Sequence, residues 1–462
     1  MLRNLIFWIT QKRWLLFAVL TGLVLYNLET PGGLTVEGYR TLIIVVLTII
    51  MIVFEPVPLP AVGLMILFLQ VFMGIDDPNG VAKSFMSDAV FFIMGSLMLA
   101  VAIVSQGLDK RLALGIIRLT GNKTWRIVFG FVAISAFLSS FIGEHTVTAM
   151  MMPVGLTLVR NAGIDKKGTA KLAALILFSI AYGSAMGSIG TPSGGGRNVI
   201  MMSYWKDFGI VDITYLGWMK RAYPILILEI PLAVLILWFS FRPKQRILDS
   251  AVRRLKIQVK KSGSITGNEI SAIVIFIFVF LGWVFLSPYF GLGIIAITGV
   301  FIYIAFGLIQ WDDLNRNTNW GVILLFGAAI SLGVQMQATG SALWVAESAI
   351  NLMKMVSDDI STLRWLTAVL LAGILTNLLS NAATVAVLGP IVLNMGGDPL
   401  FMGFSTAIAS SFAYLTVVAS PTCMIIYSSG MVQKSDYLKA GWKMFIMSIT
   451  ILFIVSKFWE VS

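Results

Sequence analysis

The sequence predicts an all-α polytopic membrane protein with about eleven transmembrane helices, two re-entrant helical hairpins and two inverted repeats. The first observation is composition: 58% of the 462 residues are hydrophobic and 12% are charged, whereas soluble domains carry roughly 25% charged residues. The second is that many apolar runs reach the roughly 20 residues that cross a bilayer as a helix. The third is that similar motifs recur at matching positions in the two halves of the chain.

Apolar runs follow one another along most of the chain. Two stretches, 125–160 and 362–398, are too long for one crossing, and small and polar residues interrupt each near its middle. We expect each to be a hairpin that enters the membrane and returns on the same side, because lipid tolerates a broken helix only where protein or water covers it. The single crossings are 14–28, 38–54, 57–74, 86–106, 169–204, 219–240, 267–287, 292–309, 320–338, 400–430 and 440–458.

The distribution of charge predicts the orientation in the cytoplasmic membrane. The longest polar segment, 242–263, holds eight basic residues against Asp249 alone, so we expect it to be cytoplasmic. Six crossings separate it from the N-terminus, which should then also lie inside, and five more place the C-terminus outside. Arg3, Lys12 and Arg13 are typical of a retained anchor and not of a cleaved signal peptide.

Composition also argues against other classes of protein. The net charge of +11 comes mainly from helix ends and loops, so no nucleic-acid partner is expected. Cys423 is the only cysteine, which excludes a disulfide framework and a cysteine-based metal site. An enzyme using Glu144 and His145 as acid and base is the weakest alternative, because no HExxH or nucleophile motif accompanies them. No cofactor is expected beyond a coupling ion.

The basic segment divides two similar halves. GEHTVTAMMMP at 143–153 corresponds to SNAATVAVLGP at 380–390, and each precedes a span broken by small residues, at 187–198 and 417–424. An odd number of crossings per repeat would give the halves opposite orientations. The expected domains are N-terminal scaffold helices 1–85, a first repeat 86–241, a cytoplasmic loop 242–266, scaffold helices 267–319 and a second repeat 320–462.

Breaks at membrane depth predict a binding site. Helix ends leave N–H and C=O groups that lipid cannot satisfy. The N–H ends attract anions, while carbonyl and hydroxyl oxygens can hold Na⁺. Inverted repeats with interrupted helices at corresponding positions are typical of secondary transporters. We therefore expect two hairpin tips and two broken spans to form one site for a small anion and its coupling cation.

At these motifs the chain resembles the divalent anion/sodium symporter family, whose members carry dicarboxylates, citrate or sulfate. That family has a Ser-Asn-Thr signature at each hairpin tip, followed by a helix that ends in proline. Here 380–382 reads Ser-Asn-Ala with Pro390 ending the helix, and 143–145 reads Gly-Glu-His with Pro153. The loss of Thr from both tips marks a divergent member. The resemblance implies a homodimer, a scaffold, a transport domain that moves like an elevator, and two Na⁺ sites.

The expected site residues fall into three groups. The resemblance implies a first cation site at Ser139, Gly143, Glu144 and Gly194. It implies a second at Thr376, Leu379, Asn381 and Ala419, to which the hydroxyl of Ser380 is added. It places substrate near His145, Thr191, Ala382 and Ser420, and side-chain chemistry adds Thr146, Arg197 and Thr384.

Several ionisable residues keep more than one interpretation. Glu144 could strengthen a Na⁺ site, carry a proton, or form a structural ion pair with Arg197. His145, the only histidine, could contact substrate or a proton, or cap the hairpin tip. Arg197 could clamp an anion through parallel hydrogen bonds or only neutralise Glu144. Glu229, in the middle of a span, could line the path or bond a neighbouring helix.

The predicted function is secondary active transport of a small anion across the cytoplasmic membrane. A di- or tricarboxylate coupled to Na⁺ by alternating access is the leading expectation. Alternatives are a proton-coupled carrier or an anion exchanger of the same fold, motivated by Glu144 and His145, or a carrier of sulfate or another oxyanion. The expected partners are the anion, Na⁺, the lipid bilayer and a second copy of the chain.

Overall fold

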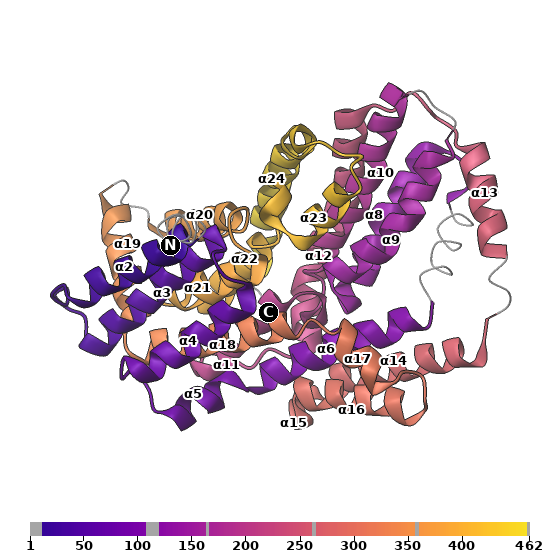
Figure 1. Ribbon diagram of the computed structural model, residues 1–462. Coiled ribbons are helices and arrows are strands. Elements are labelled where there is room, and N and C mark those ends of the chain that lie inside the picture. Colours follow the sequence, from indigo (N-terminus) through magenta and orange to yellow (C-terminus); the bar gives the residue numbers. More distant parts are fainter. Residues whose placement is uncertain (1–11, 108–119, 163–165, 261–264, 356–359, 460–462) are drawn as a thin grey trace, which may run out of the picture. The chain divides into compact units, whose positions relative to one another are not determined.

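A computed structural model describes residues 12–107, 120–162, 166–260, 265–355 and 360–459, in which the regular elements are helices (Figure 1). Within these ranges, eight helices are long and apolar enough to cross a membrane, and six shorter apolar helices accompany them. The predicted all-α polytopic fold is confirmed, while the number of crossings stays a prediction. Arg3 lies outside the described residues.

The predicted spans correspond closely to helices. The single spans are α2 (Arg13–Tyr26), α3 (Val36–Phe54), α4 (Leu59–Phe72), α6 (Asp88–Ser105), α12 (Tyr215–Phe241), α14 (Gly267–Phe285), α16 (Leu292–Ala305), α18 (Trp320–Ala338) and α24 (Lys434–Ser456). The hairpins are α8 (Thr124–Ile142) with α9 (Glu144–Arg160), and α20 (Ile360–Leu375) with α21 (Asn381–Leu393). The broken spans are α10 (Lys166–Gly187), η1 (Pro192–Gly194) and α11 (Gly196–Asp207), then α22 (Pro399–Ala409), η2 (Val417–Ala419) and α23 (Pro421–Ser428).

Shorter helices connect these elements. They are α5 (Pro78–Phe85), α13 (Asp249–Lys260), α15 (Ser287–Phe290), α17 (Trp311–Asn317) and α19 (Ser341–Lys354). The helix α13 lies in the basic segment that was expected to be a loop. The many basic residues suggested a solvated loop. However, the segment contains no glycine or proline and begins with an acidic residue, Asp249, and both features favour a helix. From α13, Ser250 Oγ donates to the Asn161 carbonyl (3.0 Å) and Arg254 Nη1 to Asn161 Oδ1 (2.7 Å), at the end of α9.

The described residues form two compact units. The first unit comprises the described parts of Met1–Val90, Ile200–Asp212 and Asn319–Ala407, and the second those of Phe91–Val199, Ile213–Thr318 and Ile408–Ser462. Because this division follows contacts and not sequence similarity, the predicted repeat boundaries stay a prediction.

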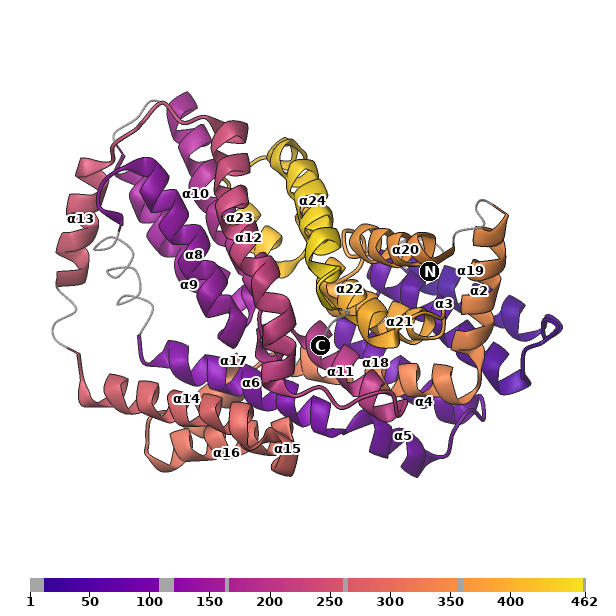
Figure 2. The ribbon, with the colours of Figure 1, turned by 180° about the vertical axis from the view of Figure 1, so that it is seen from behind.

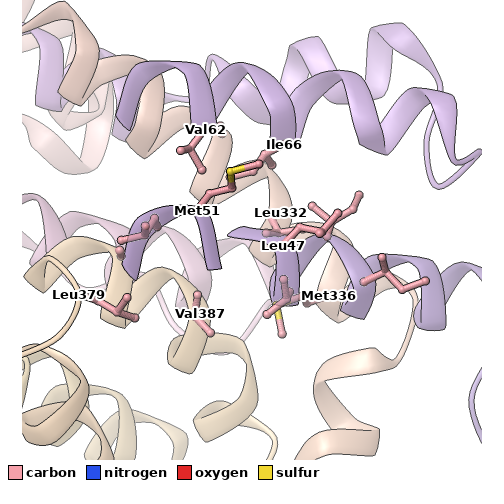
Figure 3. Packing of buried hydrophobic residues seen from close by; sticks show 14 of the residues in the cluster. Leu47, Met51, Val62, Ile66, Leu332, Met336, Leu379 and Val387 are labelled. Atoms are coloured by element: carbon pink, nitrogen blue, oxygen red, sulfur yellow. The ribbon is translucent and has the colours of Figure 1, made fainter. Parts of the chain in front are cut away.

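An apolar cluster holds the first unit together. Side chains from α3, α4, α18 and α21 interdigitate there (Figure 3). Met51, Ile66, Leu332 and Val387 are among its buried members, at no more than 8% exposure. Such packing is close to crystal density, so the second hairpin's return helix α21 is held firmly against α18.

The second unit is built around α10. In both views α8, α9, α10 and α12 lie side by side (Figures 1 and 2), and 89% of the apolar window of α10 is buried. Small residues allow close approach of α8 and α10, since a Cβ on Gly183 would lie 2.7 Å from the Val132 carbonyl oxygen. On the outer helix α14, Phe278 and Phe285 are 67% and 66% exposed, as expected of a face that meets lipid.

Candidate functional site

The first hairpin reverses at a single residue. Helix α8 ends at Ile142, Gly143 has φ +82° and ψ 147°, and α9 begins at Glu144. Residues with a side chain rarely adopt this positive φ, so glycine makes the abrupt turn possible. The turn places the Glu144 carboxylate, 7% exposed, at the start of a helix inside the second unit.

The first broken span opens next to this tip. Helix α10 ends at Gly187, and Thr191 leads into the short turn η1 with φ −137° and ψ 164°. Gly195 is also extended, at φ −157° and ψ 133°, before α11 begins. The interruption therefore exposes the carboxyl end of one helix and the amino end of another at the same place.

Hydroxyl groups tie the last turn of α8 to the broken span. Ser139 Oγ donates to the Ser184 carbonyl (2.6 Å), and Ser140 Oγ donates to the Gly187 carbonyl (2.8 Å). In return, the Thr191 hydroxyl donates to the Ser140 carbonyl. All of these groups are buried. The hairpin and the break are therefore bonded into one piece.

A buried ion pair crosses from the tip to α11. Arg197 Nη1 lies 3.6 Å from Glu144 Oε2, with the two side chains 2% and 9% exposed. Ser188 Oγ accepts a bond from Arg197 Nη2 (2.5 Å) and lies within donating distance of Glu144 Oε2 (2.8 Å) and the Ala185 carbonyl (2.6 Å). Arg197 Nε has no hydrogen-bond partner among the described residues. The ion-pair interpretation of Glu144 agrees with this geometry.

Three carbonyl oxygens converge on Gly194. A Cβ at this residue would lie 2.6 Å from the Ser188 oxygen, 2.9 Å from that of Ser140 and 3.0 Å from that of Ser139. Only glycine leaves the space between these oxygens open. Asn198 holds the loop from the other side, because its Nδ2 donates to the carbonyls of Ser188 and Thr191, both at 2.8 Å. Oxygens drawn from broken backbone are the ligands that Na⁺ meets in transporters.

The second hairpin turns differently, over 376–380. Ser380 is the N-cap of α21, and its side chain accepts from the Ala383 N–H (3.3 Å). Thr376 Oγ1 donates to Asn381 Oδ1 (2.8 Å), which joins the two arms of the hairpin. Thr384 Oγ1 donates to the Ser380 carbonyl (3.2 Å). This tip is closed by neutral side-chain bonds within the first unit.

The second break carries hydroxyl and thiol groups. Ser420 is the N-cap of α23, accepts from the Cys423 N–H (3.4 Å) and lies 2.6 Å from the Thr422 hydroxyl. Tyr437 from α24 donates to the Cys423 carbonyl (2.6 Å). These side chains are buried. In the second unit α23 packs against α9, so the second break lies near the first hairpin.

The structure brings part of the predicted site together. Ser139 and Gly194 are adjacent, and Glu144 forms an ion pair with Arg197. His145 and Thr146, half-buried, follow Glu144 in the first turn of α9. The other predicted residues lie in separate units, so their joint sites stay predictions. Thr376, Leu379, Ser380, Asn381, Ala382 and Thr384 lie in the first unit, and Thr191, Ala419 and Ser420 in the second.

Three functional candidates were missed by sequence reasoning. Ser140, Ser188 and Asn198 supply the backbone oxygens or hold them in place. The sequence did mark these three positions, because each is a polar residue within a stretch that interrupts an apolar run. Small polar residues are common wherever helices pack closely in membranes, so residue type alone does not single them out.

Known sodium-dependent transporters are similar to this chain in sequence. The sodium-dependent high-affinity dicarboxylate transporter 3 of Caenorhabditis elegans is 28% identical over 443 residues, covering 84% of this chain and 77% of that protein. The sodium-dependent dicarboxylate transporter SdcS of Staphylococcus saprophyticus is 25% identical over 457 residues, covering 93% and 87%. The chain is therefore similar to transporters over most of its length.

Two solved structures and a family model complete the comparison. The YdaH transporter of Alcanivorax borkumensis has a TM-score of 0.52 at 12% identity, covering 86% of this chain and 87% of that one. MtrF of Neisseria gonorrhoeae has a TM-score of 0.51 at 13% identity, covering 92% and 96%. These identities support the fold alone. The model described as "Sodium:sulfate symporter transmembrane region" matches residues 10–461, so the chain belongs to the sodium:sulfate symporter family of membrane transporters.

Proposed function

We propose that this protein is a Na⁺-coupled carrier of small dicarboxylate anions across the cytoplasmic membrane. The observation that carries the proposal is the convergence of three carbonyl oxygens on Gly194, between a hairpin tip and a broken helix. The names of the relatives support Na⁺ as coupling ion and dicarboxylates as cargo.

The cation is the better supported half of the proposal. The oxygens of Ser139, Ser140 and Ser188 come from two elements that hydroxyl bonds hold together. A hard monovalent ion suits such neutral oxygens, because a carbonyl oxygen has two lone pairs and can bind an ion beside the hydrogen bond that it already accepts. Glu144 lies next to this group and adds negative charge, although Arg197 balances it.

Charge balance explains why an anion would need the cation. The Glu144–Arg197 pair has no net charge, so it does not neutralise a dianion. Each bound Na⁺ supplies one of the two missing positive charges, and the amino ends of α9 and α11, at Glu144 and Gly196, offer N–H groups to an anion. Binding of substrate and cation should therefore be cooperative, which is the basis of coupled transport.

Movement of the site belongs to the proposal as well. Alternating access requires the site to face each side of the membrane in turn. The hydroxyl bonds among α8, α10 and η1 suit motion as a rigid body. A homodimer with an elevator-like transport domain, as the resemblance implies, would supply the fixed scaffold.

Uptake into proteoliposomes tests the proposal. Purified protein should accumulate radiolabelled succinate under an inward Na⁺ gradient, and replacing Na⁺ with choline should reduce uptake to the level of empty vesicles. Unlabelled dicarboxylates, citrate and sulfate then compete in turn, and strong competition by sulfate alone would favour the oxyanion alternative suggested by the family model. Undiminished uptake in choline would eliminate Na⁺ coupling.

A further inference from the structure

Glu229 is a buried acid that the site above does not use. It lies in the middle of α12, its side chain has 0% exposure, and neither carboxyl oxygen has a hydrogen-bond partner among the described residues. The hydroxyl of Ser448 in α24 lies near this carboxyl, outside the range of a normal hydrogen bond. An ionised carboxylate without donors is far more costly in such a place than a neutral acid.

Among the described residues, no cation forms an ion pair with this carboxyl. Helix α12 packs against α8, α10 and α24. Two lysines of α24 contact the far end of α12: Lys443 donates to Ser240 (3.1 Å), eleven residues beyond Glu229, and Lys439 lies over the ring of Phe241. Arg126 lies in the first turn of α8 and Lys171 in the second turn of α10, near the ends of their helices.

The remaining titratable groups of the packed helices bond elsewhere or lie toward the ends of their helices. Helix α14 contributes Glu269, whose carboxylate accepts from the Thr266 N–H (2.6 Å). Helix α10 contributes Tyr182, whose hydroxyl donates to the Tyr414 carbonyl (2.9 Å). The other titratable side chains of α24 are Lys434, Asp436, Tyr437, Lys439 and, at its C-cap, Lys457. The described surroundings therefore favour the protonated form of Glu229.

Ser448 and Tyr414 link the surroundings of Glu229 to the two breaks. The Tyr414 hydroxyl lies 3.4 Å from that of Ser448, and Tyr414 stands two residues before Thr416, which leads into η2. Tyr182 of α10, the helix that ends at the first break, donates to the Tyr414 carbonyl (2.9 Å). A negative charge at Glu229 would act on Ser448 and Tyr414 with little screening, because both are buried.

Two prolines bracket this part of α12. Pro224 and Pro231 lie inside the helix, on either side of Glu229. Each removes a backbone N–H and so leaves a carbonyl one turn earlier without its helical donor. The helix can bend at these positions, which offers a route for water to reach the acid when the unit changes conformation.

We propose that Glu229 is a proton-binding site whose occupancy sets the rate of transport. In the conformation described here the carboxyl carries its proton. When the unit rearranges, the O–H bond breaks, the proton passes to water, and the carboxylate keeps the electron pair; reprotonation restores the starting conformation. The statement about rate rests on the proposed transport function, whereas the statement about proton binding does not.

Infrared difference spectroscopy tests proton binding without transport. Near neutral pH, purified wild-type protein should show the carbonyl band of a protonated carboxylic acid, and the band should vanish in Glu229→Gln. The matched control is Glu269→Gln, because Glu269 is also buried, at 8% exposure, but accepts hydrogen bonds from Thr266. Absence of a band that depends on Glu229 would overturn the proposal. Elution as a single species in gel filtration shows that each variant is folded.

The pH profile of uptake tests the effect on rate. A rise in pH removes the proton, so wild-type uptake should fall, by about tenfold per unit once the acid titrates. Glu229→Gln mimics the neutral acid and should give a flat profile over the same range, with Glu269→Gln following wild type. A pH profile that Glu229→Gln leaves unchanged would refute control of rate by this proton, even if uptake itself is Na⁺-dependent.

Discussion

The two broken spans have similar backbone conformations but different side chains. Thr191 and Thr416 enter their short turns at φ −137°, ψ 164° and φ −130°, ψ 160°, and both turns have three residues. Gly195 and Ser420 leave them at φ −157°, ψ 133° and φ −150°, ψ 157°. This match is what an internal repeat predicts, while the inversion of the halves stays a prediction.

The side chains at matching positions differ sharply. The first break places Gly194, Arg197 and Asn198 where the second has Ala419, Thr422 and Cys423. The first break therefore has a charged pair and three carbonyl oxygens grouped around Gly194. The second break has neutral side chains that bond to one another. The comparison indicates that the first break is the one suited to ions, and mutations at paired positions test this.

The largest expected effect is at the ion pair. Arg197→Met should leave Glu144 buried without its cation, which costs about 3–5 kcal/mol of stability. The paired change Thr422→Val removes one hydroxyl bond and should cost about 1 kcal/mol. Thermal unfolding in detergent measures both. Equal losses at the two breaks would contradict the proposed specialisation.

Asn198 should show a smaller difference in the same direction. Asn198→Ala removes both side-chain donors from buried carbonyls, at a cost of about 1–3 kcal/mol. At the paired position Cys423→Ala removes a weak thiol contact with the Ala413 carbonyl (3.5 Å) and should cost less than about 1.5 kcal/mol. If Cys423→Ala proves the more damaging variant in unfolding experiments, the first break does not depend on Asn198.

The hairpin tips should give the smallest effect. Ser380 caps α21 with its side chain, whereas the first tip has no side-chain cap at Gly143. Ser380→Ala should therefore cost about 1 kcal/mol, and Ser380→Asp, which keeps a capping oxygen, should restore most of it. Unfolding midpoints of the three proteins check this order. A neutral Ser380→Ala would show that the cap contributes nothing at this tip.

Much of the fold was predictable because membrane helices are encoded by long apolar runs. Hairpin turns at 143 and 376–380 and both broken spans fall where small and polar residues interrupt those runs. The family match confirms a transporter and not an enzyme, and confirms the resemblance drawn from the motifs. Helix α13 was missed because its charge suggested a solvated loop.

The site was only partly predictable. Gly143, Glu144 and Gly194 were identified from their motifs. In the structure Gly143 makes the turn, Glu144 forms the ion pair, and Gly194 allows the close approach of three carbonyl oxygens. Ser188 and Asn198 were not identified, because their roles depend on which carbonyls folding places beside them. Orientation, the dimer and the joint substrate site stay predictions.

The Na⁺ dependence of uptake in Gly194→Ala tests the central claim most directly. The added methyl group fills the space between the three carbonyl oxygens, so the half-saturating Na⁺ concentration should rise by at least about tenfold. Gly267→Ala, where a Cβ has no atom within 4 Å, is the matched control and should behave as wild type. Folded Gly194→Ala protein with wild-type Na⁺ dependence would contradict the account.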